Sequence, residues 1–206
     1  MQQHNPNILI ISNMGPKPSA PFQGAFVKQQ ADALSAMAPE YHFMRWHTDS
    51  YLNKLLKYPV FIADFIWRFI LRRKRFDILH VHFFYPTIWL ALLYRWCRNR
   101  SARIVVTCHG SDIYKYQPPG IWYRWSAAKV DYWIFSSHKL QSHFFRDVPA
   151  SSVLSAGIPA DYADVAELTR TEKTIDLLYV GTLDHNKGMD RLIAMLPELA
   201  GLKIVI

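Results

Sequence analysis

Short apolar runs alternate along the chain with longer segments whose apolar residues recur every three or four positions. The first run, residues 8–11, predicts a strand, and the loop that follows contains several glycines and prolines. Residues 25–37 then have helical spacing. The loop leads into the start of this helix, and the free backbone N–H groups at the helix start could bind a phosphate. The residues predicted near one face of the helix are Phe26, Gln30, Ala33, Leu34 and Met37.

The same alternation continues to residue 159. Further strands are predicted at residues 41–46, 77–82, 103–108, 132–135 and 152–154. Helices are predicted within 52–74, 87–98 and 120–129, and Ser137 is placed to cap another helix. Strands that alternate with helices of this length favour a parallel sheet with helices on both faces. The predicted fold class is therefore α/β with a Rossmann-like sheet.

The composition changes after residue 159. Residues 160–174 are polar and lack a strong period, which is typical of a linker or a bridging helix. A second alternation follows, with strands at 175–180 and 203–206 and a helix at 189–200. A β-α-β piece of this size buries too little apolar surface to stand alone. We therefore expect an N-terminal domain at 1–159, a linker at 160–174, and an incomplete second domain at 175–206, so that the chain is a fragment or a truncated product.

Composition adds two constraints. Half of the residues are hydrophobic and 19% are charged, which allows a large core and argues against disorder. The only two cysteines, Cys97 and Cys108, give no disulfide framework, and the chain opens on a polar stretch instead of a secretory signal. We expect reduced cysteines and a cytoplasmic protein.

The formal charge of +8 favours an anionic partner: nucleic acid, a phosphorylated ligand or an acidic membrane face. Residues 67–75 place aromatic side chains beside a basic cluster, a pattern typical of a helix on an anionic membrane surface. A core helix with a solvated basic end is the alternative. Asp64 and Arg68 interrupt the apolar run before this cluster, so it is too short and too charged to span a bilayer.

Histidines mark the ends of two predicted buried strands. His80 and His82 lie on one strand, and His109 follows the next in the sequence Thr-Cys-His-Gly-Ser-Asp. In open parallel sheets, ligands bind beyond the carboxyl ends of the strands. His80 and His82 point to the same side of their strand, so a metal site with His109 is conceivable, while a lone histidine is as often structural. The chain lacks the G-x-G-x-x-G fingerprint, which argues against a nicotinamide enzyme.

Four segments in order resemble the N-terminal half of a family 4 retaining glycosyltransferase with the GT-B fold, in which two Rossmann-like domains face each other across a cleft. Residues 8–27 are similar to the first strand, glycine loop and helix of that family. Asp77-Ile-Leu-His-Val-His82 resembles its D-[IV]-[IVL]-H-x-H strand, and residues 107–112 resemble its T-x-H-G-x-D loop. Residues 179–188 are similar to its V-G-R-L-x-x-x-K-G segment, which begins the nucleotide-binding domain.

The resemblance implies transfer of a sugar from a nucleotide-diphosphate sugar to an acceptor in polysaccharide or glycolipid biosynthesis, with retained configuration. It implies that His109 is catalytic and hydrogen-bonds the donor sugar, and that backbone at Gly24 approaches acceptor and diphosphate closely. Lys187 would neutralise the departing diphosphate. No cofactor and no metal are implied beyond the donor substrate. The other residues expected to bind substrate are Gly15, Asp112 and Thr182.

Three departures from the family pattern affect these expectations. Thr182 stands where the family has an arginine, Ala156 stands where it commonly has an asparagine, and its E-x7-E donor segment would fall beyond residue 206. We hypothesise that the 206-residue chain alone is inactive, which sugar transfer by the purified chain would contradict.

The alternative function is a truncated, non-catalytic binding module that lacks most of the donor site. Nucleic-acid binding rests on charge and aromatic content alone, without a recognised motif. The expected partners are therefore a nucleotide-sugar donor, a lipid-linked or saccharide acceptor and an anionic membrane surface, and no nucleic acid. The expected location is the cytoplasm, with peripheral association at the inner membrane face.

Overall fold

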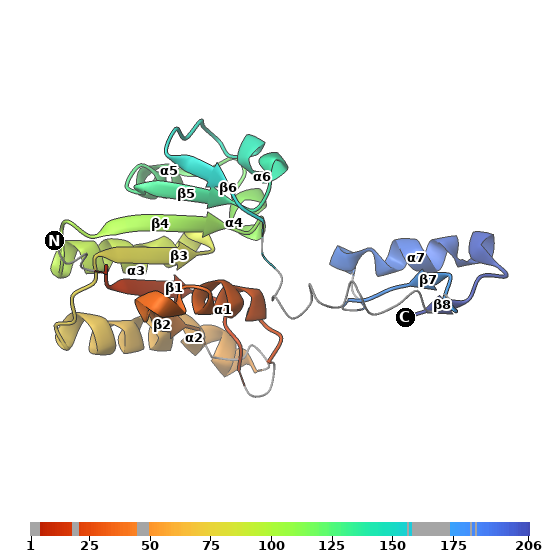
Figure 1. Ribbon diagram of the computed structural model, residues 1–206, viewed down its shortest axis with the longest axis horizontal. Coiled ribbons are helices and arrows are strands. Elements are labelled where there is room, and N and C mark those ends of the chain that lie inside the picture. The colour runs from red at the N-terminus through yellow and green to blue at the C-terminus, as the bar shows by residue number, and fades with distance from the viewer. Residues whose placement is uncertain are drawn as a thin grey trace. The chain divides into compact units, whose positions relative to one another are not determined.

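A computed structural model describes residues 5–17, 21–44, 50–155, 157, 174–181, 183 and 185–206. The chain forms two compact units, residues 1–158 and 159–206. The first unit is built on a six-stranded sheet of order β2-β1-β3-β4-β5-β6, and every neighbouring pair is parallel (Figure 1). Its strands are β1 (Ile8–Ser12), β2 (Glu40–Phe43), β3 (Ile78–His82), β4 (Arg103–Cys108), β5 (Tyr132–Phe135) and β6 (Ser151–Val153).

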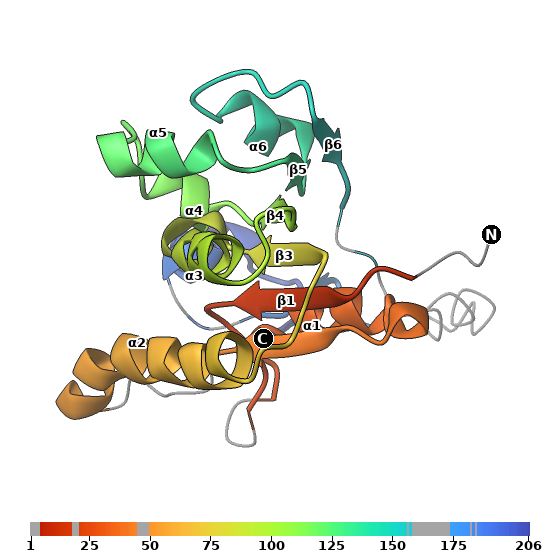
Figure 2. The ribbon, with the colours of Figure 1, turned by 90° about the vertical axis from the view of Figure 1, so that its left-hand side faces the viewer.

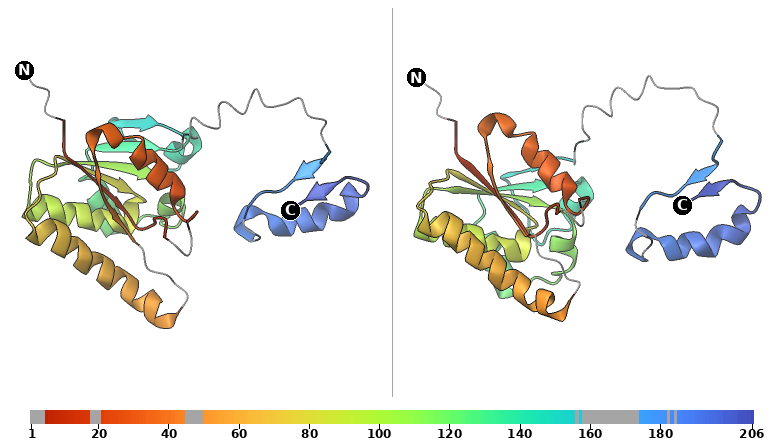
Figure 3. Two further views of the ribbon diagram at one scale, coloured as in Figure 1. Left: turned by 60° about the horizontal axis from the view of Figure 1, so that its bottom comes forward. Right: turned by 90° about the horizontal axis from the view of Figure 1, so that it is seen from below.

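Helices cover both faces of this sheet. Figure 2 shows α2, α3 and α5 along one face, and Figure 3 shows α1 across the other. This arrangement confirms the predicted α/β, Rossmann-like class. The helices are α1 (Ala25–Asp32), α2 (Tyr51–Phe65), which continues as a π-helix (Ile66–Leu71), α3 (Phe84–Cys97), α4 (Ser111–Tyr114), α5 (Ile121–Ala127) and α6 (His138–Ser142), with a 3-10 turn at Ser35–Met37.

The core lies on the two faces of the sheet, as the alternation of side chains along β1 shows. Leu9 and Ile11 join the large cluster beneath α2, α3 and α5, whereas Ile8 and Ile10 pack on the other face with Ala31 of α1. All four strand residues are buried. Burial on both faces explains why this strand is a continuous apolar run instead of an alternating one.

The first helix is shorter than predicted. It ends at Asp32, and a 3-10 turn follows. Its buried residues are Val27 and Ala31, one turn apart. The helical spacing predicted as far as Met37 ends early, because Met37 lies in the 3-10 turn. The small side chain of Ala31 lets the helix approach the sheet closely, and Phe26 packs instead on the ring of His109.

Several local predictions are confirmed. The Ser137 hydroxyl caps α6 by accepting a hydrogen bond from the Leu140 N–H at 3.1 Å. Cys97 and Cys108 are both free thiols.

An N-cap that the sequence analysis missed is Ser50, whose hydroxyl accepts a hydrogen bond from the Asn53 N–H at the start of α2.

The second unit contains one β-α-β piece whose two short strands are parallel. Its elements are β7 (Leu177–Leu178), a 3-10 turn (His185–Lys187), α7 (Met189–Met195), a second 3-10 turn (Leu196–Leu199) and β8 (Ile204–Val205). The strands are shorter than predicted. The linker predicted at residues 160–174 lies outside the described residues except for residue 174, so the domain limits stay predictions. Within the described part of the chain, no helix has the length and apolarity needed to cross a membrane.

Two glycines fix the turn that carries the chain from β1 to α1. Gly24 precedes α1 with a φ of +69°, a conformation that side chains rarely adopt. A β-carbon at Gly24 would lie 3.0 Å from the backbone nitrogen of Gly15, and one at Gly15 would lie 2.5 Å from Cβ of Phe43. The fold therefore requires both glycines, independently of any ligand.

Gly24→Ala should lower the free energy of unfolding by about 2 kcal/mol, because the added methyl combines a positive φ with overlap against Gly15 backbone. Gly120→Ala is the matched control, since Gly120 has a φ of −68° and open space around it. The control should change stability by less than about 1 kcal/mol. Urea unfolding of the two variants measures both values, and equal stabilities would contradict the prediction.

Candidate active site

The carboxyl ends of β1, β3 and β4 lie level with one another. Ser12 pairs with His82 across β1 and β3, and His82 pairs with Thr107 across β3 and β4. The turns that leave these strands therefore begin at one edge of the sheet, where parallel α/β proteins bind ligands. His109 follows β4 at this edge and is partly exposed.

Three imidazoles form a row along this edge. His80 and His82 lie on the same side of β3 with ring centroids 4.4 Å apart, which confirms the predicted orientation. His82 and His109 are nearly parallel, and 3.1 Å separates Nδ1 of His82 from Nε2 of His109. Nε2 of His80 lies 2.8 Å from the hydroxyl of Thr107. The row thus joins two half-buried imidazoles, His80 and His109, through the fully buried His82.

Burial keeps this row neutral. It lowers the pKa of His80 and of His109 to about 4, and lowers the pKa of His82 well below its ordinary value. The neighbouring imidazoles act in the same direction on His82, because a second positive charge nearby is unfavourable. At neutral pH, His109 therefore offers hydrogen bonds and no charge.

Two phenylalanines enclose the ring of His109. Phe26 from α1 meets it edge-on with centroids 5.0 Å apart, and Phe83, which follows β3, lies 4.5 Å away. Phe83 has a φ of +62°, a strained conformation for a side chain of this size, which costs about 1–3 kcal/mol. Such strain is concentrated where a ligand site needs a fixed geometry. The rings shield the imidazole from water and leave a limited approach to it.

The carboxylate of Asp112 holds the turn that carries His109. It is 2% exposed and accepts hydrogen bonds from the backbone N–H groups of His109, Gly110 and Phe84 at 3.0, 2.9 and 2.9 Å. Burial raises its pKa, although these hydrogen bonds act in the opposite direction. The observed contacts of Asp112 are with backbone, which gives it a positioning part in this turn.

No group of three or more His, Cys, Asp or Glu side chains within the described ranges has an arrangement that could hold a metal ion. The members of the imidazole row instead contact one another and Thr107.

A model described as Glycosyltransferase Family 4 matches residues 29–162, which is more than half of the chain. The chain belongs to glycosyltransferase family 4. The match spans β2 to β6 and includes the whole imidazole row and Asp112. A comparison with curated proteins gives no match.

The glycosyltransferase fold brings four of the six predicted site residues into one region. Gly15 and Gly24 meet in the β1–α1 turn, Phe26 of the same helix contacts His109, and Asp112 binds the His109 backbone. Lys187 lies exposed in the second unit, and Thr182 lies outside the described residues. The roles of all six toward a substrate stay predictions.

Sequence reasoning missed the side chains that surround His109. The His-x-His spacing of β3 did predict that His80 and His82 lie on one side of the strand, because side chains alternate with a period of two. It did not predict that His82 contacts His109. The contact of Phe26 with His109 was not predicted. The left-handed conformation of Phe83 has no signal in the sequence, since it results from the packing of its neighbours.

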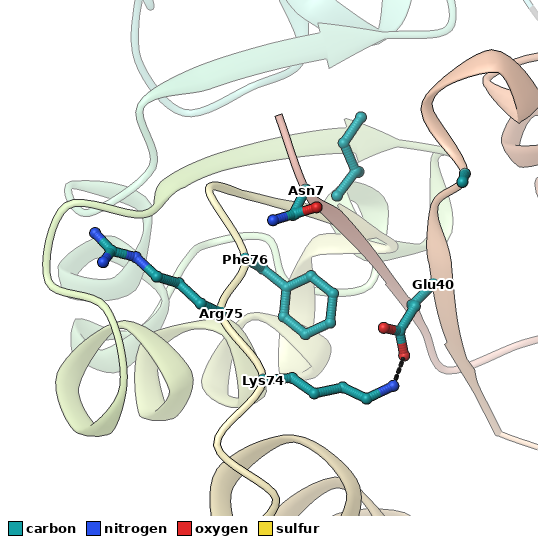
Figure 4. A pocket seen from close by; sticks show the side chains of 7 residues that line it. Asn7, Glu40, Lys74, Arg75 and Phe76 are labelled. Atoms are coloured by element: carbon teal, nitrogen blue, oxygen red, sulfur yellow. Dashed lines mark hydrogen bonds and ion pairs between the residues drawn. The ribbon is translucent and has the colours of Figure 1, made fainter. Parts of the chain in front are cut away.

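A hollow of about 230 Å³ lies at the opposite edge of the sheet, where β1 and β3 begin. Figure 4 shows the ring of Phe76 toward this hollow and the ion pair of Lys74 with Glu40, whose atoms are 2.6 Å apart. The amino ends of parallel strands are not where such sheets bind substrates. We therefore do not assign this hollow to the glycosyltransferase site. Its lining residues are Asn7, Ile8, Ala38, Glu40, Lys74, Arg75 and Phe76.

The imidazole row should make the glycosyltransferase less stable in mild acid. In the unfolded chain these imidazoles bind protons below about pH 6.5, whereas in the folded chain His80 and His109 resist protonation until about pH 4. The unfolded state therefore binds more protons between these values, and the unfolding temperature should fall as the pH is lowered through them. Scanning calorimetry from pH 7 to 4 measures the slope.

His80→Gln should reduce that slope by removing one of the titrating groups. An unfolding temperature independent of pH in this range would contradict the neutral row. Asp112 acts in the opposite direction, because burial raises its pKa.

Proposed function

We propose that residues 1–158 form the acceptor-side domain of a GT-B glycosyltransferase, and that the second unit begins its nucleotide-sugar-binding domain. The reaction is transfer of a sugar from a nucleotide-diphosphate sugar to an acceptor hydroxyl in polysaccharide or glycolipid biosynthesis, with retention of configuration. The observation that carries this proposal is the neutral, partly exposed imidazole of His109, held between two phenylalanines at the carboxyl edge of the sheet in a family 4 chain.

The chemistry of the row suits a sugar better than a phosphate. A neutral imidazole forms a hydrogen bond without adding charge, which suits a sugar hydroxyl. The leaving diphosphate instead needs positive charge, which in our proposal comes from Lys187 of the second unit. Metal and organic cofactors have no part in this proposal, and the donor is a substrate.

His109→Ala should lower kcat by about 100-fold, the usual cost of removing one preorganised hydrogen-bond donor from a reacting centre. The assay measures transfer of labelled sugar from UDP-glucose, GDP-mannose and related donors to a membrane-lipid extract, using the protein that contains this chain. His143→Ala is the control, since His143 is exposed and outside the row. Undiminished transfer by the His109 variant would overturn the proposed site.

We also propose that the helical layer of α2, α3 and α5 rests on an anionic membrane, at the cytoplasmic face. Large apolar side chains on the outer surface of this layer are 46 to 77% exposed. Cations accompany them: the Arg72 guanidinium lies 5.7 Å from the ring of Trp67, and the Lys129 ammonium lies 5.5 Å from that of Trp125. Aromatic and basic groups together suit a bilayer interface. The exposed apolar residues are Trp67, Leu71, Trp96, Ile121, Trp122 and Trp125.

This proposed membrane-binding surface of the protein includes the predicted segment 67–75 and extends over the two further helices α3 and α5. The rings of Trp89 and Trp125 stack with centroids 5.7 Å apart, which joins α3 to α5. A protein held in this way would meet an acceptor carried by a membrane lipid, and we propose a lipid-linked or saccharide acceptor on this ground.

The double variant Trp67→Ala, Trp122→Ala should bind vesicles containing phosphatidylglycerol about tenfold more weakly, because each substitution removes apolar area that would enter the interface. Phe22→Ala is the matched control, since this 89% exposed aromatic residue precedes α1 on the other face of the sheet. Co-sedimentation with anionic and neutral vesicles measures both. Equal binding to the two kinds of vesicle, or none to either, would remove the membrane proposal.

A further inference from the structure

One ring nitrogen of His82 has a hydrogen-bond partner and the other has none. The residue is 0% exposed, and its Nδ1 lies 3.1 Å from Nε2 of His109. Its Nε2 is buried and has no hydrogen-bond partner, a state shared by few polar atoms in the described part of the chain. Buried polar groups without partners are rare and need an explanation.

Only two proton arrangements satisfy the contact between two neutral rings. In the first, Nδ1–H of His82 donates to Nε2 of His109, so that His109 carries its proton on Nδ1 and Nε2 of His82 is a bare lone pair. In the second, Nε2–H of His109 donates to Nδ1 of His82, so that Nε2–H of His82 is a buried donor with no acceptor. Each ring has a single proton, so choosing one tautomer fixes the other.

The environment of His82 discriminates between the two arrangements. A buried N–H without an acceptor is the rarer kind of orphan, and an unsatisfied acceptor is tolerated more often. The groups that face the pair are the imidazole of His80, which contacts Thr107, and the rings of Phe26 and Phe83 on the side of His109. None of the contacts observed for these groups supplies an acceptor to Nε2 of His82.

We propose that His82 is a positioning residue that locks His109 in its Nδ1–H tautomer, so that His109 presents a hydrogen-bond donor to an oxygen of the bound sugar. The inference rests on the proposed function for the identity of that ligand, while the tautomer itself is a property of the unliganded chain. The hydrogen bond to His82 occupies Nε2 of His109, which leaves Nδ1 for the ligand. His109 is therefore a fixed donor and cannot act as a base while the contact holds.

Nitrogen-15 NMR of the histidine-labelled full chain at pH 7 tests the tautomer directly. Long-range nitrogen–proton correlations should show a protonated Nδ1 and a bare Nε2 for His109, and the same pattern for His82. A protonated Nε2 on His109 in the wild-type chain would overturn the proposal without any variant.

Two substitutions at position 82 separate positioning from packing. Asn places an amide at the position of Nδ1, so His82→Asn should keep the Nδ1–H tautomer of His109. His82→Leu removes the donor, and His109 should revert to the Nε2–H form that free imidazole side chains prefer. If His109 keeps the Nδ1–H form in His82→Leu, with backbone amide spectra showing an intact fold, then His82 does not set it.

The transfer assay supplies the second readout. His82→Leu should lower kcat by about tenfold or more with little change in KM for the donor, because a wrong tautomer presents a lone pair where the sugar needs a donor, and His82→Asn should recover most of the loss. Equal kcat for the Leu and Asn variants would overturn the positioning role. If the tautomer is found but His109→Ala transfers sugar normally, the proposed function fails and the tautomer lock stands.

Discussion

The buried carboxylate of Asp112 joins the two turns that follow β3 and β4. One of its oxygens accepts from the N–H groups of His109 and Gly110, and the other accepts from Phe84 at the start of α3. Loss of this side chain would leave three N–H groups unpaired, each at a cost of about 1–3 kcal/mol where it stays buried. The strained Phe83 directly precedes the anchored Phe84, so the same carboxylate helps to hold the ring that packs on His109. The imidazole row depends on the hydrogen bonds of Asp112, because they hold the turn from which His109 contacts His82.

Burial then decides what kind of chemistry the edge can perform. The row is neutral at pH 7, since desolvation dominates the pKa of each imidazole. Neutral groups recognise hydroxyls well but stabilise a departing diphosphate poorly. A glycosyltransferase that uses this edge for its sugar therefore needs its positive charge from another element. The proposed division between His109 in the first unit and Lys187 in the second follows from this electrostatic requirement.

The sequence predicted the elements whose signals are local and missed those set by packing. β4 and β5 appeared at their observed residues, because both contain short runs of β-branched or aromatic apolar side chains, which favour strands. The shared side of His80 and His82 followed from the period of a strand. The face of α1 that lies against the sheet was not predicted, and it is the small Ala31 that packs there, while Phe26 contacts His109. Phe83 adopts a positive φ that its neighbours impose, and neither its conformation nor its contact with His109 is encoded in a pattern.

The proposed membrane surface and the proposed site use different parts of the same sheet. The exposed tryptophans belong to helices that cover one face, whereas His109 lies at the carboxyl edge. A face and an edge of a sheet point in different directions, so a protein lying on its helical layer keeps its edge open. The two parts are close in the sequence, because Asp112 anchors the His109 turn and Ile121 begins the exposed part of α5. Tyr123 strengthens this connection by donating its hydroxyl to the Asp112 carbonyl. Docking of the helical layer would therefore fix the position of the proposed sugar-binding turn relative to the bilayer, which is what transfer to a lipid-borne acceptor requires.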